Sequence, residues 1–474
     1  MMMGIPDYSY ITIIILLMVL FSCVVQLVYA VSPEKISDHD QRVAPLVFFA
    51  IALFMVIQFF VQILPEFKPY AFADDWIYSK PLDFKSFSQW VDFAFSQHVD
   101  HRIPIQKLSN FFVLKAFGFD FRSIVGLNYI MAFMASLMLI YVARVYRGRS
   151  SVGDLIIPLG IMHFSAGYTL WGFQFQFLSS IFFVACFTFF ATRFTQNSKS
   201  SNIVLAAVSL LACALCGING LLFATVITAG ISGWFLINQA ENKVPRLTFL
   251  IIFVLEVILW LNWTRSDATH VEGLNAFEFF RYTFNLLPSS MGVFAFDGIP
   301  WKSGLILLFF IPAMILIALR LLKRVLTLRE LILALVAVSS FVVMLSVAVG
   351  RSKVQGSWSS GVAMHYGSMS IFMPVMSWMI ISKSIQSRAS SVAGVVLTLV
   401  FLAAYVTNLD WREGVISGAR AHQKEIVDAL QSGESSQAVM ERFYNDFSVG
   451  EENKPQVVKG IDAFRAAGSK LYGP

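Results

Sequence analysis

Charged residues are scarce in this chain. Only 14% of its 474 residues are Asp, Glu, Lys or Arg, whereas about 25% is usual in soluble proteins. This scarcity excludes a soluble multi-domain enzyme and a disordered protein, because both depend on a high content of charge. Cysteine is scarce too, and all four cysteines fall within apolar runs, which excludes a secreted disulfide scaffold. The CxxC spacing of Cys213 and Cys216 is interpreted as small side chains on a helix face.

Apolar residues, by contrast, are abundant. Hydrophobic residues make up 57% of the chain, with 46 Phe, and the mean hydropathy is +0.69. These values indicate that a lipid bilayer surrounds most of the chain, and they predict an all-α polytopic membrane protein. The net charge of +6 is attributed to loop residues that flank membrane spans, so we expect membrane lipids and no nucleic acid among its partners.

Apolar runs long enough to cross the hydrocarbon core recur along the chain. The sequence predicts about twelve spans of roughly 17–25 residues: 9–31, 44–64, 124–143, 155–172, 174–192, 202–216, 218–237, 247–264, 303–319, 331–349, 365–382 and 391–408. No Lys or Arg precedes the first run, so it lacks the basic region of a signal peptide and is expected to stay attached.

The orientation of the spans follows from the loop charges. Lys and Arg are more than twice as dense in one set of loops as in the other, and the positive-inside rule places the denser set in the cytoplasm. The predicted extracytoplasmic loops are 65–123, 265–302 and 351–364, within a transmembrane domain of residues 1–408. A polar helical tail, 409–474, is predicted on the same side, with helical patterns around 412–431 and 436–447.

Two adjacent acids open the first long loop. Asp74 and Asp75 precede Trp76, shortly after the predicted span that ends near residue 64. Paired carboxylates just above a membrane can act as a general base or bind a divalent cation. Solvated loop acids are the alternative interpretation, and the sequence leaves open which of the two would be the base.

An interfacial helix is predicted to follow these acids. The SFSQ segment at 86–89 has the spacing of a capping box, and the apolar residues after it recur every three or four positions, as in a helix lying flat on a bilayer. Continued, this pattern reaches His98, His101 and Arg102, which would share one helix face. Pro104 is expected to end or redirect the helix.

Further polar residues lie in apolar surroundings. Gln174 and Gln176 fall in a WGFQFQF segment at the outer end of a hairpin, where they either pair neighbouring helices or contact a ligand. Glu256 lies in the middle of a predicted span. Such an acid suggests a transport or proton path, but it is the only one found there.

A short outer loop near residue 350 contains basic residues at both ends. Arg351 and Lys353 open the loop, and His365 and Tyr366 close it. Basic residues at a helix boundary suit a lipid phosphate through charge pairing and the guanidinium fork. Interfacial anchoring is the alternative interpretation, since Arg and Lys side chains extend toward water at helix ends.

Taken in order, these segments resemble one family. The ADDW motif at 73–76 resembles the catalytic acidic motif of GT-C fold glycosyltransferases. HVDHRIP at 98–104 resembles the H-x-(E/D)-H-R-I segment of bacterial members akin to serotype-converting O-antigen glycosyltransferases. WGFQFQF at 171–177 and NGLLF at 219–223 are similar to later landmarks of those chains. Gly350-Arg351 followed by His365-Tyr366 resembles a G-R…R-Y pattern, with His365 where Arg is expected. The resemblance covers about residues 65–380.

The resemblance implies a GT-C-like transferase that uses a polyprenyl-phosphate sugar such as an undecaprenyl-phosphate sugar as donor. It implies transfer to a lipopolysaccharide O-antigen-like or other acceptor glycan outside the bacterial inner membrane. Asp74 or Asp75 would be the base, and no cofactor is required, although a divalent cation on the two acids and a His is a further alternative. The residues predicted to bind the donor phosphate or sugar are His98, His101, Arg102, Arg351, His365 and Tyr366. Trp76, Gln174 and Gln176 are predicted to contact the acceptor or to pack between helices.

Two other classes of function remain open. A transporter or flippase for a lipid-linked glycan is expected to contain several charges within its spans and internal repeats. The sequence contains one mid-span acid and no clear repeat. A non-catalytic envelope assembly protein would not need the paired carboxylates. The loop acids therefore favour the transferase.

Overall fold

The structure of the protein is a computed structural model. The structure describes residues 9–31, 38–99, 101–164, 171–238, 243–264, 276–296, 301–351, 367–385, 387–447 and 449–473. These residues are helical in the main and form no strands. The predicted all-α class is confirmed over them.

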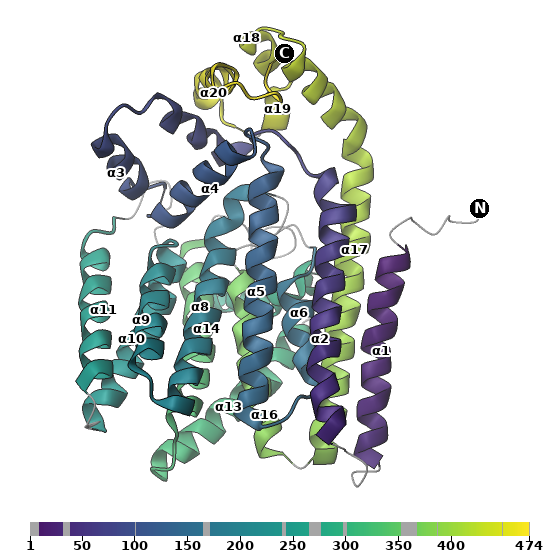
Figure 1. Cartoon of the computed structure of the whole chain (residues 1–474), viewed down its shortest axis with the longest axis vertical. Coiled ribbons are helices and arrows are strands. Elements are labelled where there is room, and N and C mark those ends of the chain that lie inside the picture. The colour runs from purple at the N-terminus through teal and green to yellow at the C-terminus, as the bar shows by residue number, and fades with distance from the viewer. Residues whose placement is uncertain are drawn as a thin grey trace.

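A bundle of long apolar helices forms the body of the protein (Figure 1). Within the described residues, nine helices are long and apolar enough to cross a membrane, as expected of a polytopic integral membrane protein. They are α1 (Ser9–Val31), α2 (Asp38–Gln58), α5 (Arg122–Arg147), α8 (Phe175–Asn197), α10 (Ile218–Ile237), α11 (Lys243–Leu261), α13 (Trp301–Leu322), α14 (Leu328–Arg351) and α17 (Ser387–Gln431).

The other three predicted spans coincide with shorter helices. The run 155–172 contains α6 (Ile156–Ile161), 202–216 corresponds to α9 (Ser200–Ala214), and 365–382 contains α16 (Phe372–Ser384). Each is shorter than the roughly 17 residues that a straight span needs. Nearly all of α16 is buried against neighbouring helices, which explains its continuous apolar run without contact with lipid. The total of about twelve spans stays a prediction.

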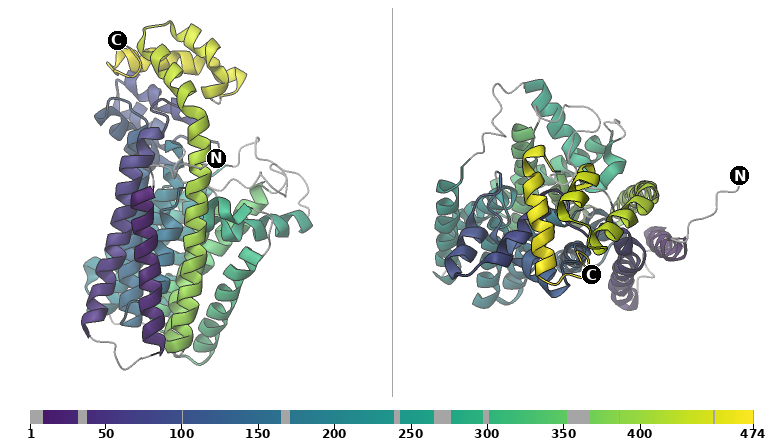
Figure 2. Two further views of the ribbon diagram at one scale, coloured as in Figure 1. Left: turned by 90° about the vertical axis from the view of Figure 1, so that its right-hand side faces the viewer. Right: turned by 90° about the horizontal axis from the view of Figure 1, so that it is seen from above.

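One helix joins the bundle to the C-terminal tail. α17 has 45 residues, so it is about 68 Å long, far more than the roughly 30 Å of a hydrocarbon core. Its apolar part ends near Arg412, and the polar remainder rises beyond the other helices (Figure 2). The helical patterns predicted at 412–431 and 436–447 fall in α17 and in the two short helices that follow it.

The tail and the first long loop lie together at one end of the bundle (Figure 1). The loop forms η4 (Ala73–Asp83), α3 (Phe87–Phe95) and α4 (Pro104–Ala116); the tail forms α18 (Ser436–Arg442), α19 (Tyr444–Phe447), η10 (Glu451–Asn453) and α20 (Lys454–Ala466). Residues of both share a hydrophobic core distinct from that of the bundle. The remaining short helices are η2 (Phe59–Ile63), η3 (Leu64–Glu66), η5 (Val152–Leu155), η6 (Gly172–Gln174), α12 (Ala276–Leu286), η8 (Leu287–Phe296) and η9 (Ser368–Ile371).

Candidate functional site

Asp74 and Asp75 lie in the first turn of η4 and have different surroundings. Ala73, which begins the helix, has a φ of 52°, in the left-handed region that non-glycine residues rarely adopt. Asp75 accepts a hydrogen bond from the backbone N–H of Phe72 at 3.4 Å and is only 2% exposed. The Asp74 side chain is 45% exposed. The motif therefore presents one accessible acid and one buried acid.

The buried position changes the protonation of Asp75. Burial raises the pKa of Asp75 well above its usual range, and the charge of Asp74 adds to the increase. The hydrogen bond from Phe72 and the indole of Trp171 lower the pKa but do not offset burial. Asp75 consequently favours its protonated form, which leaves Asp74 as the acid suited to accept a proton from a ligand.

His98 reaches Asp74 from a tight turn. The backbones of His98 and His101 exchange two hydrogen bonds of 2.8 Å, and Val99 between them has a φ of 50°. His98 Nε2 lies 3.5 Å from Asp74 Oδ1. Both members of this pair thus stand beside a non-glycine residue in the left-handed region. Such local strain gathers at functional sites.

The predicted continuation of the interfacial helix to His98 and His101 is wrong. α3 begins at the predicted capping box, where Ser86 Oγ accepts the N–H of Gln89, but it ends at Phe95. Residue 104, a proline, begins α4 instead of ending a helix, and proline suits this first position because no intrahelical N–H is needed there. The two histidines are therefore brought together by the turn and not by helical spacing.

Lys107 of α4 explains why α3 ends where it does. Its buried Nζ donates to the carbonyls of Phe93 at 2.8 Å and Ser96 at 2.7 Å. These bonds serve carbonyls that lack partners at a helix end. Burial, followed by the charges of Lys80 and Arg102, lowers the pKa of Lys107 to about 8.

The other two basic residues of the turn contact the bundle. Arg102 donates to the carbonyls of Phe95 at 2.6 Å and Asn262 at 2.9 Å, so it ties the end of α3 to the end of α11. A Cβ atom placed on Gly217 would lie 3.4 Å from His101 Nδ1, which puts His101 against the start of α10. Their predicted contact with a donor phosphate stays a prediction.

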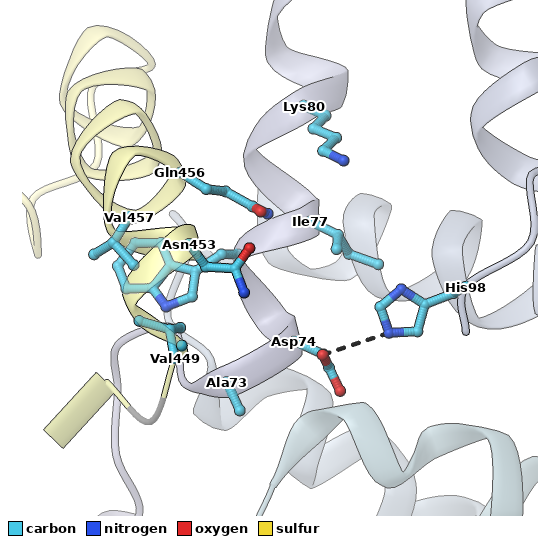
Figure 3. A pocket seen from close by; sticks show the side chains of 11 residues that line it. Ala73, Asp74, Ile77, Lys80, His98, Val449, Asn453, Gln456 and Val457 are labelled. Atoms are coloured by element: carbon cyan, nitrogen blue, oxygen red, sulfur yellow. Dashed lines mark ion pairs between the residues drawn. The ribbon is translucent and has the colours of Figure 1, made fainter. Parts of the chain in front are cut away.

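The Asp74–His98 pair opens on a cavity of about 390 Å³. One wall is η4, with Asp74 and Lys80, and His98 forms another. The facing wall comes from the C-terminal tail and includes Asn453 and Gln456, whose side chains project toward η4 (Figure 3). This volume lies within the range of about 300–1,000 Å³ for small-ligand sites. Carboxylate, imidazole, ammonium and amide groups therefore converge on one space of ligand size.

A second cavity of about 350 Å³ adjoins the first. Ile77, Lys80 and His98 line both, while Phe84 and Lys107 are among the residues that line only the second. Asp74 lines only the first. The two cavities thus meet at a wall that contains two basic groups.

Trp76 holds the tail against the loop. Its indole is 1% exposed and lies edge-on to the ring of Phe447, with centroids 5.4 Å apart. A Cβ on Gly460 of α20 would lie 2.6 Å from the Trp76 ring, so only glycine allows this approach. In addition, the N–H of Ala71 donates to the Tyr472 hydroxyl at 2.8 Å. Contact of Trp76 with an acceptor stays a prediction, although Trp76 also lines the first cavity.

Asn453 and Gln456 are residues that the sequence reasoning missed. The polarity and the helical patterns of the tail do not indicate which element it contacts. Phe443 and Phe447, spaced four residues apart within it, are the signal that could have indicated an apolar helix face in need of a partner. Once the tail is known to dock on η4, its polar residues become part of the site.

The other polar residues in apolar surroundings differ in their hydrogen bonds. The backbone N–H of Gln176 donates to Gln106 Oε1 at 2.9 Å, while Gln174 Oε1 is buried without a hydrogen bond from any described residue. Glu256 is fully buried and accepts from the Thr228 hydroxyl at 3.0 Å. The predicted ligand contacts of Gln174 and Gln176 stay predictions.

The structure gives no side-chain contacts for the three residues predicted near the short outer loop. His365 and Tyr366 lie outside the described residues, and for Arg351 only the backbone, at the end of α14, is described. Among the described residues, no group of three or more His, Cys, Asp or Glu side chains could hold a metal ion.

Comparison with known proteins yields no relative for this chain. No family model, no curated protein and no solved structure matches it. The resemblance to GT-C glycosyltransferases therefore stays a prediction from the motifs.

Proposed function

We propose that this protein is an integral-membrane glycosyltransferase that moves a sugar from a polyprenyl-phosphate donor to an O-antigen-like cell-envelope glycan. The observation that carries the proposal is the accessible acid Asp74, which lines a cavity beside His98 and Lys80 at one end of an apolar bundle. A donor held by its lipid stays in the bilayer, so its reactive end needs a polar site directly beside the membrane.

In this proposal the site faces away from the cytoplasm of a bacterial inner membrane. The loop distribution of Lys and Arg favours that orientation. No nucleotide sugar is needed there, because the donor carries its own leaving group. The lipid anchor of the donor also explains why the acids lie in a loop at the bundle end and not in the middle of a span.

Asp74 acts as the general base in the proposed reaction. It removes the proton of an acceptor hydroxyl as the hydroxyl oxygen forms a bond to the anomeric carbon of the donor sugar. The bond between that carbon and the phosphate oxygen breaks, and its electron pair leaves with the polyprenyl phosphate. Attack opposite the leaving group inverts the anomeric centre. Asp75, buried and favouring its protonated form, supports the turn that positions Asp74.

Lys80 and His98 are placed to assist the leaving group. Both line the wall between the two cavities, one of which contains the base. A cation at this wall would stabilise the negative charge that grows on the departing phosphate. His98 Nε2 also lies 3.5 Å from Asp74 Oδ1, so the base and this basic group face the same part of the cavity.

Sugar transfer in vesicles tests the proposal. The full-length protein is compared with Asp74→Asn, with Asp75→Asn, and with Asp83→Asn, which removes an exposed acid from the end of the same helix. Radiolabelled sugar on polyprenyl phosphate is the donor, and an envelope glycan extract is the acceptor. General-base catalysis contributes about 100- to 10,000-fold, so Asp74→Asn should lower kcat by such a factor.

The other two variants should keep most of the activity. Wild-type activity from Asp74→Asn, at matched expression and with normal membrane insertion, would exclude Asp74 as the base. Loss of transfer in Asp75→Asn alone would move the base to the buried acid. An absence of transfer by the wild-type protein would remove the proposed function.

A further inference from the structure

The cavity at Asp74 is built from two distant parts of the chain. η4 supplies Asp74 and Lys80, and the tail supplies Asn453 and Gln456 (Figure 3). The tail wall is fixed in place, because α20 packs on η4 through Gly460 and the Trp76 ring. The amides are thus held opposite the accessible acid by a packed interface.

The chemistry of this cavity suits a sugar ring. Asn and Gln amides both donate and accept hydrogen bonds, as sugar hydroxyls do. Asn453 is exposed and Gln456 is half-buried, so both can be reached by a ligand. The Asn453 amide nitrogen donates to Oε1 of the exposed Glu452 at 3.2 Å but makes no helix-capping bond. Ile77 and Val457 give the cavity apolar surface, on which the carbon face of a sugar can rest.

The second cavity suits the donor. Lys80 and His98 line it together with Phe84 and Phe93. Lys107, whose Nζ is bonded to Phe93 and Ser96, and the acid Asp92 line it as well. This combination of basic and apolar groups matches a lipid phosphate. It also lies along α3, whose outward face is apolar and exposed at Phe87, Val91 and Phe95, as in a helix at a bilayer surface.

The position of Asp74 decides which cavity receives the acceptor. A general base has to contact the hydroxyl whose proton it removes, and Asp74 lines the tail-side cavity but not the second one. The shared wall of Ile77, Lys80 and His98 is then the place where the acceptor hydroxyl meets the donor.

We propose that the C-terminal tail forms the acceptor site, in which Asn453 and Gln456 bind hydroxyls of the acceptor sugar and so select which glycan is glycosylated. This inference rests on the proposed function and assigns the substrate of its tail-side cavity. Asn453 and Gln456 are specificity-determining residues and take no part in proton transfer.

Steady-state kinetics of the full-length protein in vesicles test the assignment. The double variant Asn453→Ala/Gln456→Ala is compared with Lys459→Ala, an exposed position on the same helix that lines neither cavity. Loss of two hydrogen bonds should raise the acceptor KM by about 5- to 150-fold, with the donor KM and kcat unchanged. Asn453→Ser and Gln456→Glu, which keep a hydrogen-bonding group, should recover part of the affinity.

A binding measurement separates this inference from the proposed function. Saturation-transfer NMR is recorded on the full-length protein in nanodiscs with free oligosaccharides from the envelope glycan extract as the probe. If the wild-type protein transfers sugar but the double variant keeps its acceptor KM, the acceptor assignment is overturned and the transferase stands. A raised donor KM in place of the acceptor KM would overturn it as well.

The opposite failure is also distinguishable. If the wild-type protein transfers no sugar but contacts the oligosaccharide, and the double variant loses that contact, the proposed function fails while the glycan site stands. A wild-type protein with neither transfer nor contact overturns both. Equal thermal unfolding of the variants and the wild type shows that each comparison is made on folded protein.

Discussion

At the scale of single residues, the burial of Asp75 makes the free energy of unfolding depend on pH. Burial raises the pKa of its carboxyl in the folded protein above the value near 3.9 of an unfolded chain. The folded state then binds more protons than the unfolded state between these two pKa values, so the free energy of unfolding falls as pH rises through this window. We predict that Asp75→Asn, which cannot ionise, loses this dependence and unfolds at a higher temperature than the wild type above the window.

Thermal unfolding in detergent micelles from about pH 4 to pH 8 measures the effect, since the window begins near pH 3.9. Asp83→Asn is the control, because Asp83 is exposed at the end of the same helix. It should keep the slope of the wild type. A pH slope in Asp75→Asn as steep as in the wild type would contradict the assignment of the titration to Asp75.

The sequence identified the pair of acids but could not separate their roles. Adjacent residues in a helical turn point in different directions, and which one is buried depends on the backbone of Ala73 and on what packs below it. Neither the left-handed φ of Ala73 nor the neighbouring Trp171, almost a hundred positions away, is encoded in the local pattern. The local sequence therefore predicts that the motif contains two acids, whereas distant contacts determine which of the two is buried.

At the scale of elements, Lys107 is predicted to fasten α3 to α4. Its Nζ is the donor to the carbonyls of Phe93 and Ser96. In Lys107→Met both carbonyls lose a charged donor, although the Phe93 carbonyl keeps the Ser96 hydroxyl as a partner, and the loss should cost about 1–3 kcal/mol. Because the cost falls on local opening of α3, its amides should exchange hydrogen about 5- to 150-fold faster.

Hydrogen exchange measured by mass spectrometry reports on residues 87–95. Lys115→Met, an exposed position of the same helix α4, should leave the rates unchanged. Equal exchange of α3 in both variants would show that Lys107 does not hold the helix end.

The start of α3 was predictable and its end was not. The capping box is a local signal within the SFSQ segment at 86–89, and the structure contains it. The end of the helix depends on Lys107, a residue of the following helix. The periodicity of α3 does not contain this information, and a prediction from periodicity alone extends the helix to His98 and His101. Pro104 was expected to end or redirect the predicted helix, but it begins α4, because proline is compatible with a first helical turn as well as with a helix end.

At the scale of the whole molecule, hydropathy predicted the apolar bundle well but not the partnership of loop and tail. An apolar run indicates burial in lipid or in protein alike, so hydropathy alone does not distinguish a lipid-facing span from the short, protein-buried α16. Trp76, Phe447 and Phe464 belong to one hydrophobic core. This core joins the first long loop to the C-terminal tail, which lies far away in the sequence. In the sequence, only a few aromatic residues within the polar tail indicate this core.

This shared core yields the last prediction, that Gly460→Leu detaches the tail from η4. A Cβ at residue 460 would lie 2.6 Å from the Trp76 ring, which Phe447 and Phe464 hold in place, so the side chain has to be accommodated by separation at a cost of about 1–3 kcal/mol. Trypsin should then cleave the tail faster, and a raised acceptor KM should accompany the cleavage. Ala466→Leu, exposed on the same helix, should match the wild type in both. If Gly460→Leu resists trypsin as the wild type does, the tail does not depend on this contact, and the acceptor wall at Asn453 must be held in another way.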